Sequence, residues 1–179
     1  NRAGVAPAPD LLPLLGQSEV GYRNLMRLVS AAYLEGDPQL PPQLPFARVA
    51  ELGEGLIALS GGPSGALDRL LGEGQGAAAE AWLAELRGAF AGRLYVELQR
   101  HGLPAEARIE GALLDLAYRH DIPLLATNDV FFASEDLYEA HDALLCIAGG
   151  VTLAEEQRRR VGRLGLAEQG RAAPAGNPG

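Results

Sequence analysis

Three short apolar runs alternate with longer segments of helical period along most of this chain. The runs cover residues 56–60, 94–99 and 123–127, and their lengths are typical of buried strands. The segments between them carry apolar residues three or four positions apart, which predicts amphipathic helices. Alternation of this kind predicts parallel strands that are joined by helical crossovers. We therefore expect an α/β fold in which the three runs share one sheet, although three strands are too few to close a barrel.

One helix is predicted over residues 19–34, directly after Ser18, a residue type that caps helix N-termini. Its expected buried face consists of Tyr22, Leu25, Met26, Val29, Ala32 and Tyr33. Further helices are expected over residues 64–71 and 77–91, from Pro104 onward and from Ser134 onward. Ser64 and Ser134 are the expected caps, and Pro104 suits the first position of a helix because that position needs no N–H donor.

The two ends of the chain differ in composition from its middle. Residues 1–15 are rich in Pro and Leu without a clear period, so we expect an irregular segment there. Residues 161–179 carry few large apolar side chains and are expected to form a disordered tail. Residues 16–160 then constitute one domain. Because the chain starts at Asn1 and not at Met, we expect it to be a fragment of a longer product.

The charge of the chain limits its binding partners. The net charge is −8 and the pI is near 4.9, which argues against general nucleic-acid binding, since phosphate contacts need clustered cations. All 15 basic residues are Arg, so lysine Schiff-base chemistry and a P-loop lysine are excluded. The single cysteine, Cys146, rules out an internal disulfide and is expected to be a small core residue. No apolar run approaches the ~20 residues of a membrane span. We also expect a cytoplasmic location.

Ionisable and amide side chains follow two of the strand-like runs. Glu97 lies within the run 94–99, where it is either a ligand-positioning group or the partner of a nearby Arg. His101 follows that run and is either a metal ligand or a polar loop residue. Because active sites of parallel α/β proteins lie at the carboxyl ends of strands, these residues mark the face on which a site is expected.

A second group follows the run 123–127. Asn128 and Asp129 either hold a ligand or close an Asx-turn on their own backbone. His141 and Asp142, on the predicted last helix, either form a ligand and its orienting carboxylate or lie on the helix surface.

Several blocks of sequence resemble one known family in their order and separation. Residues 21–25, 54–62, 94–102, 122–132 and 140–150 are similar to the PHP (polymerase and histidinol phosphatase) domain of bacterial replicative DNA polymerase III alpha subunits. The resemblance runs from about residue 15 to residue 160. It implies an incomplete PHP-type (β/α)7 barrel with parallel strands. It also implies a polynuclear zinc, manganese or magnesium site, which supports phosphoester cleavage in some members and is degenerate in others.

The sequence departs from the family pattern at the metal site. The opening His-x-His strand is absent, and Phe131 stands where active members have the His of an Asp-x-His pair. Only Asp129 and, less directly, His101 match metal-site positions, so we expect neither catalysis nor a tightly held cofactor in this fragment.

The resemblance therefore predicts a fragment of the replicative polymerase that comprises most of its PHP support domain and lacks the polymerase active site. Its implied partners are DNA, through the parent polymerase, a proofreading exonuclease and other replicase subunits, with no membrane partner. Two alternatives remain: a free-standing metal-dependent PHP phosphoesterase, and a non-catalytic module that docks a proofreading exonuclease. The coding DNA on either side of this sequence would show whether it belongs to a polymerase or to a free-standing phosphoesterase.

Overall fold

The structure is a computed structural model that describes residues 9–128, 130–155, 160–161 and 167–168. It divides into two units, which are described separately below. The first unit comprises residues 1–99 and 107–126, and the second comprises residues 100–106 and 127–179.

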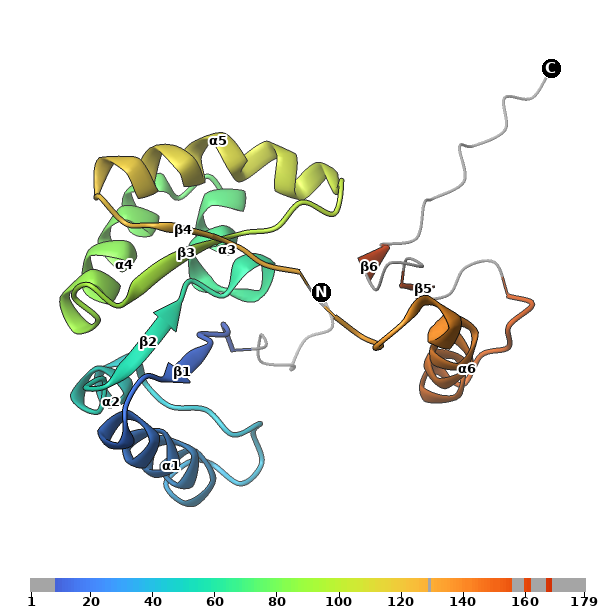
Figure 1. Ribbon diagram of the computed structural model, residues 1–179, viewed down its shortest axis with the longest axis horizontal. Helices are drawn as coiled ribbons and strands as arrows, with labels where there is room; N and C mark the ends of the chain where they lie inside the picture. The colour runs from blue at the N-terminus through green and yellow to red at the C-terminus, as the bar shows by residue number, and fades with distance from the viewer. Residues whose placement is uncertain (1–8, 129, 156–159, 162–166, 169–179) are drawn as a thin grey trace. The chain divides into compact units, whose positions relative to one another are not determined.

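A four-stranded sheet forms the centre of the first unit (Figure 1). Its strands, in spatial order, are β1 (Leu14–Gly16), β2 (Leu56–Leu59), β3 (Leu94–Leu98) and β4 (Leu124–Ala126). The pairs β2–β3 and β3–β4 are parallel, whereas β1 runs antiparallel to β2. The three apolar runs thus share one mostly parallel sheet, which confirms the predicted α/β fold. The expectation of an irregular segment over residues 1–15 is wrong at its end, because a three-residue edge strand is too short to show a period.

Helical crossovers connect the parallel strands, as predicted. The helices are α1 (Glu19–Leu34), α2 (Phe46–Glu51), α3 (Ala66–Gly72), α4 (Gly76–Ala89) and α5 (Pro104–Arg119), with a 3₁₀ turn η1 (Gly62–Ser64). Helix α1 lies against β1 and β2, and α3 packs against α4 (Figure 1).

The two faces of the sheet differ in how well they are covered. Leu56, Ala58, Leu94 and Val96 alternate with their neighbours along β2 and β3 and are fully buried. Their partners in the core come from the helices and include Leu67, Leu83, Leu86, Leu113 and Leu116. The opposite face carries Ile57, Tyr95 and Leu125, which are half-buried, and Leu59 and Glu97, which are buried. The sheet is open because β1 and β4 form two edges, as expected of an incomplete barrel.

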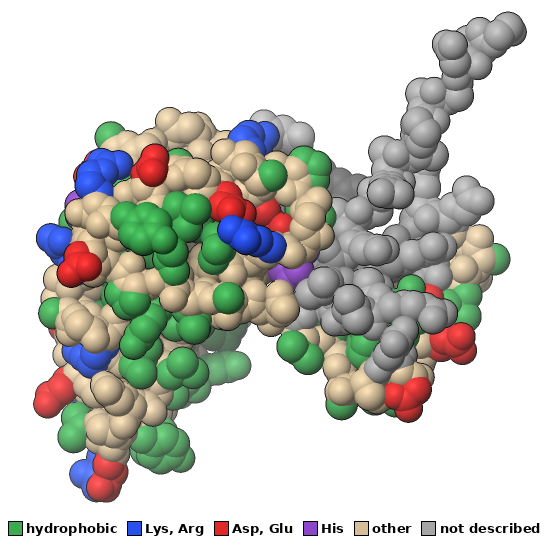
Figure 2. All heavy atoms as spheres, turned by 45° about the horizontal axis from the view of Figure 1, so that its top comes forward, with side chains coloured by type: hydrophobic (Ala, Val, Ile, Leu, Met, Phe, Trp, Pro, Cys, Tyr) green, Lys and Arg blue, Asp and Glu red, His purple; other side chains and the backbone are tan. Residues whose placement is uncertain are grey.

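Apolar side chains also reach the surface of the first unit. Figure 2 shows hydrophobic side chains on this unit interspersed with Arg, Asp and Glu. The large ones that are most exposed are Leu34, Tyr118 and Tyr33, at 83%, 74% and 71%. Each lies in the last turn or two of a long helix, where fewer core residues are within reach.

Helix α1 has the predicted bounds and cap but buries a different face. Ser18 Oγ accepts a hydrogen bond from Gly21 N at 3.2 Å, as expected of the N-cap. The buried residues are Gly21, Asn24, Leu28 and Ala31. Of the predicted face, Leu25 and Ala32 are half-buried, whereas Tyr22, Met26, Val29 and Tyr33 are exposed. The predicted apolar face is therefore wrong.

A close contact with the loop before β2 explains the orientation of α1. A Cβ atom at Gly21 would lie 1.8 Å from the carbonyl oxygen of Gly55, so the helix and loop approach backbone to backbone. Asn24 Nδ2 donates a hydrogen bond to Glu54 O at 3.1 Å, one turn further along. The backbone contact and the hydrogen bond, and not the apolar periodicity of the helix, therefore decide which face of α1 is buried.

Two predicted serine caps are also wrong. Ser64 ends the 3₁₀ turn η1, and Gly65 occupies the N-cap position of α3. In the second unit, Ser134 precedes a 3₁₀ turn, η2 (Glu135–Leu137), and the N-cap of helix α6 (Tyr138–Gly149) is Leu137. The first 3₁₀ turn ends at the expected cap, and the second lies between the expected cap and the helix.

The second unit also contains a short antiparallel pair, β5 (Arg160–Val161) and β6 (Ala167–Glu168). Cys146 on α6 is buried, as predicted. The rest of the predicted tail, residues 162–166 and 169–179, lies outside the described residues. Within the described part of the chain, no helix has the length and apolar character that a bilayer crossing requires.

Candidate functional site

The ends of β2 and β3 are joined by side chains in the first unit. Glu97, only 6% exposed, accepts a hydrogen bond at Oε2 from the backbone N–H of Gly61 at 2.7 Å. Glu97 N in turn donates to the buried Ser60 Oγ at 3.0 Å. One carboxylate oxygen of Glu97 is thus bound to backbone, which reduces the lone pairs available for a ligand.

The glycines that follow β2 permit this arrangement. Gly61 has φ +93°, a left-handed conformation that disfavours other residues, and a Cβ atom there would lie 2.2 Å from Leu11 O. The turn presents the Gly61 N–H toward Glu97. The Gly61–Gly62–Pro63 sequence therefore acts as a tight strand-ending turn and not as a phosphate loop.

His101 belongs to the second unit, where it pairs with Glu106. The imidazole is 2% exposed, and its Nδ1 lies 2.6 Å from Glu106 Oε1. Glu106 Oε2 accepts hydrogen bonds from the backbone N–H groups of His101 at 2.8 Å and Leu103 at 3.2 Å. Glu106 is the third residue of α5, so its carboxylate caps backbone N–H groups at the helix N-terminus while it contacts the imidazole.

This pairing determines what His101 can do chemically. In the neutral imidazole that carries its proton on Nδ1, this N–H donates a hydrogen bond to Glu106, and the lone pair is on Nε2. His101 Nε2 is buried and makes no hydrogen bond to any residue that the structure describes. A carboxylate that orients a histidine in this way is the usual arrangement behind a metal-binding imidazole. The geometry is thus compatible with a ligand role for His101, which stays a prediction.

The other predicted metal ligand, Asp129, lies outside the described residues. Its neighbour Asn128 is exposed, and neither an Asx-turn nor another side-chain hydrogen bond of Asn128 occurs within the described part of the chain. The pairing of Asp129 with His101 therefore stays a prediction as well.

Phe131, which stands where the family has a histidine, lies in a group of aromatic side chains. The ring centroids of Phe131 and His141 lie 5.7 Å apart, and those of Phe132 and His141 lie 5.5 Å apart. Phe132 also contacts Tyr138 edge-on at 6.2 Å. His141 thus packs against two phenylalanines, which favours its interpretation as a packed helix residue over that of a ligand.

The described residues do not bring together the ligands of a polynuclear metal centre. Residues 9–128 and 130–155 contain no group of three or more His, Cys, Asp or Glu side chains that could hold an ion together. Catalytic zinc usually has three protein ligands, and a two-metal site needs more. Among the described residues, His101 offers a buried nitrogen with an orienting carboxylate.

Sequence reasoning did not identify Ser60 or Glu106 as partners. Ser60 carries no local signal, because its role depends on β3 lying alongside β2. Glu106 could have been found, since Pro104 at the first helical position followed by an acidic residue at the third is typical of a capped N-terminus.

Comparisons with known proteins agree with the geometry of the fold. The family model described as "PHP domain" matches residues 3–101. The chain is 53% identical to the DNA polymerase III subunit alpha of Caulobacter vibrioides (strain NA1000 / CB15N) over 156 residues, which cover 87% of this chain and 14% of that protein. It is 40% identical to the protein of the same name from Vibrio cholerae over 147 residues, 82% of this chain and 13% of that protein. The chain thus spans about one seventh of the length of these curated relatives.

Proposed function

Because this chain belongs to the PHP domain family, we propose that it serves as the PHP region of a bacterial DNA polymerase III alpha subunit. The observation that carries the proposal is the 53% identity to one such subunit across 87% of the chain. The parent protein would carry out template-directed nucleotidyl transfer. The proposed role of the PHP region is to support that polymerase and not to perform its chemistry.

The chemistry of the strand ends supports a non-catalytic role. Hydrolysis at a polynuclear centre needs several ligands that hold two or three cations close together. Here Phe131 contributes a ring that packs on His141, and Glu97 uses one carboxylate oxygen on the backbone of Gly61. Asp129 and His101 would together hold at most one zinc, manganese or magnesium ion weakly.

The partners and location follow from the same proposal. The chain would meet DNA through the parent polymerase, and would meet a proofreading exonuclease and other replicase subunits in the bacterial cytoplasm. A net charge of −8 opposes direct binding to phosphates, so the isolated chain should bind single-stranded DNA only weakly and in a salt-sensitive way. Submicromolar binding to single-stranded DNA at physiological salt would contradict this.

A chimera tests the supporting role. The aligned 156 residues of the Caulobacter vibrioides subunit would be replaced by their counterparts from this chain, and primer extension would be measured. We expect the chimera to retain activity, whereas deletion of the same segment should abolish it. A folded chimera without primer extension would refute the proposal.

A hydrolysis assay tests the non-catalytic role. Purified protein would be incubated with manganese or zinc, first with a nucleotide phosphoester and then with a 3′-labelled primer. We expect no turnover, and none from Phe131→His alone, because the other ligands would still be missing. Turnover that disappears in Asp129→Ala would favour the phosphoesterase alternative instead.

A further inference from the structure

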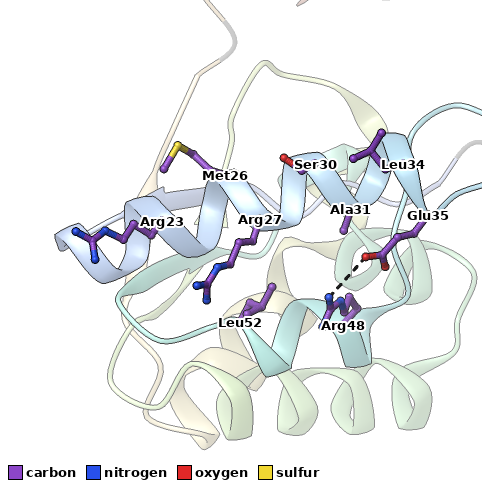
Figure 3. A pocket seen from close by; sticks show the side chains of 9 residues that line it. All are labelled: Arg23, Met26, Arg27, Ser30, Ala31, Leu34, Glu35, Arg48 and Leu52. Atoms are coloured by element: carbon purple, nitrogen blue, oxygen red, sulfur yellow. Dashed lines mark ion pairs between the residues drawn. The ribbon is translucent and has the colours of Figure 1, made fainter.

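We propose that the groove between α1 and α2 binds a short peptide segment that carries carboxylates beside an apolar anchor residue. The groove has a volume of about 660 Å³ (Figure 3). It is lined by Arg23, Met26, Arg27, Ser30, Ala31, Leu34, Glu35, Arg48 and Leu52. Both helices belong to the first unit, so the groove is formed within one body.

Three of the 15 arginines of this acidic chain line the groove, together with one carboxylate, Glu35. Glu19 and Glu51 lie outside the lining and pair with two of these arginines, which leaves Arg27 as the third. Arg27 extends from α1 toward Leu52 and makes no hydrogen bond or ion pair with any described residue (Figure 3). An unpaired guanidinium presents a planar set of donors that matches a carboxylate.

The other two arginines have partners that they could exchange. Arg23 pairs with Glu19 on the same helix, and both side chains are exposed. Arg48 lies 2.9 Å from Glu51 and 3.7 Å from Glu35. Exposed ion pairs of this kind are weak, so an incoming carboxylate can compete for the same guanidinium groups.

Apolar side chains lie beside these charges. Met26 is 46% exposed and Leu34 is largely exposed, both on α1, and Leu52 lies half-buried at the groove. Methionine adapts its shape to the group it contacts, which suits a surface that receives a foreign side chain. The groove can therefore offer both an ionic contact and apolar burial to a single ligand.

These features favour a peptide over a nucleic acid. None of the nine lining residues is aromatic, so a base would find no ring on which to stack. The net charge of −8 also opposes a polyanion, whereas it opposes a peptide with two or three carboxylates much less. Inorganic phosphate would leave the apolar side chains unused.

Fluorescence anisotropy with the whole chain tests the proposal. The probe is a labelled 12-residue peptide of leucine and glutamate, compared with the same peptide in which glutamine replaces every glutamate. We expect saturable binding of the acidic peptide that is at least about threefold tighter than that of the neutral one, a ratio in the range of one or two surface charge contacts. A labelled oligo-dT of equal charge should bind more weakly than the acidic peptide, and tighter binding of the oligo-dT would overturn the choice of ligand.

Two variants in the groove and one control variant outside it locate the binding site. Arg27→Gln should weaken peptide binding about three- to fivefold, whereas Arg108→Gln, which removes another exposed helix arginine, should leave it unchanged. Glu35→Gln should tighten binding, since it removes the one carboxylate that lines the groove and leaves Arg48 with Glu51 as its only described partner. A gain of this kind cannot come from unfolding. Equal effects of Arg27→Gln and Arg108→Gln, or no gain in Glu35→Gln, would refute the proposal.

Discussion

The carboxylate of Glu97 accepts a hydrogen bond from the backbone of Gly61 at 2.7 Å, across the ends of two parallel strands. The backbone N–H of Glu97 in turn donates a hydrogen bond to Ser60 Oγ. Together the two bonds extend the pairing of β2 and β3 beyond the strands themselves. These two hydrogen bonds give Glu97 a structural role in the candidate site.

Removal of this carboxylate should destabilise the chain. We expect Glu97→Ala to lower the free energy of unfolding by about 1–3 kcal/mol, because it leaves the N–H of Gly61 without this acceptor. Glu97→Gln should cost less, since an amide oxygen can still accept the bond. Urea denaturation followed by circular dichroism measures both. Glu85→Ala, on the exposed side of α4, is the control, and an equal effect of Glu97→Ala and Glu85→Ala would contradict this prediction.

Two of the helical glycines, Gly21 and Gly88, should respond oppositely to alanine. Gly88→Ala in α4 meets no atom within 4 Å and should stabilise the chain by up to about 1 kcal/mol through helix propensity. Gly21→Ala gains the same propensity but places a methyl group against Gly55, so we expect a net loss of about 1–3 kcal/mol. Thermal and urea unfolding compare the two. Stabilisation by Gly21→Ala would show that α1 does not approach the loop so closely.

Adjacent residues of α1 test which face is buried. Leu28 is 4% exposed and Val29 is 52% exposed. Leu28→Ala should therefore cost about 2–5 kcal/mol of unfolding free energy, as core truncations do. Val29→Ala should cost less than about 1 kcal/mol. The reverse order of the two losses would support the face that periodicity predicts.

Acidification should break the link between the N-terminal segment and α3. Arg69 donates two hydrogen bonds of 2.8 Å to Asp10, and these bonds hold the pKa of the Asp10 carboxyl below its usual value. A lowered pKa in the folded state means that the stabilisation is present above the unfolded pKa of about 3.9 and is lost as the pH falls through the folded pKa. Asp10→Asn should thus lose less stability than wild type below pH ~4. Urea midpoints at a series of pH values measure this.

The Asp10 measurement has a matched control. Asp115→Asn removes an exposed carboxylate of α5 that no guanidinium contacts within the described residues. Its loss of stability on acidification should follow that of wild type. The prediction fails if Asp10→Asn and Asp115→Asn lose stability in parallel.

Much of the secondary structure could be predicted because its signals are local. The runs that form β2, β3 and β4 are short and continuously apolar, and each ends at a turn residue or a polar group. Helix α1 follows a serine cap, and α5 begins at a proline. Parallel pairing followed from alternation alone, since adjacent parallel strands require a crossover.

The candidate site was only partly predictable for the same reason. The position of His101 after a strand predicted a potential ligand. Its contact with Glu106 depends on where the first turn of α5 lies relative to the imidazole, which the sequence does not specify. Phe131 was visible as a departure from the family pattern. Its contact with His141 depends on how the segment before α6 folds.

The sequence by itself determined β2, β3 and β4, their parallel direction and the long helices, because period, caps and run length act over a few residues. It did not mark the antiparallel edge strand β1 or the short helix α2. Only the tertiary structure decided which face of α1 is buried. That choice depends on Gly21 meeting the carbonyl of Gly55, two residues separated by more than a complete helix. Apolar periodicity describes which face could be buried, but a close backbone contact and the hydrogen bond from Asn24 to Glu54 select the face that is.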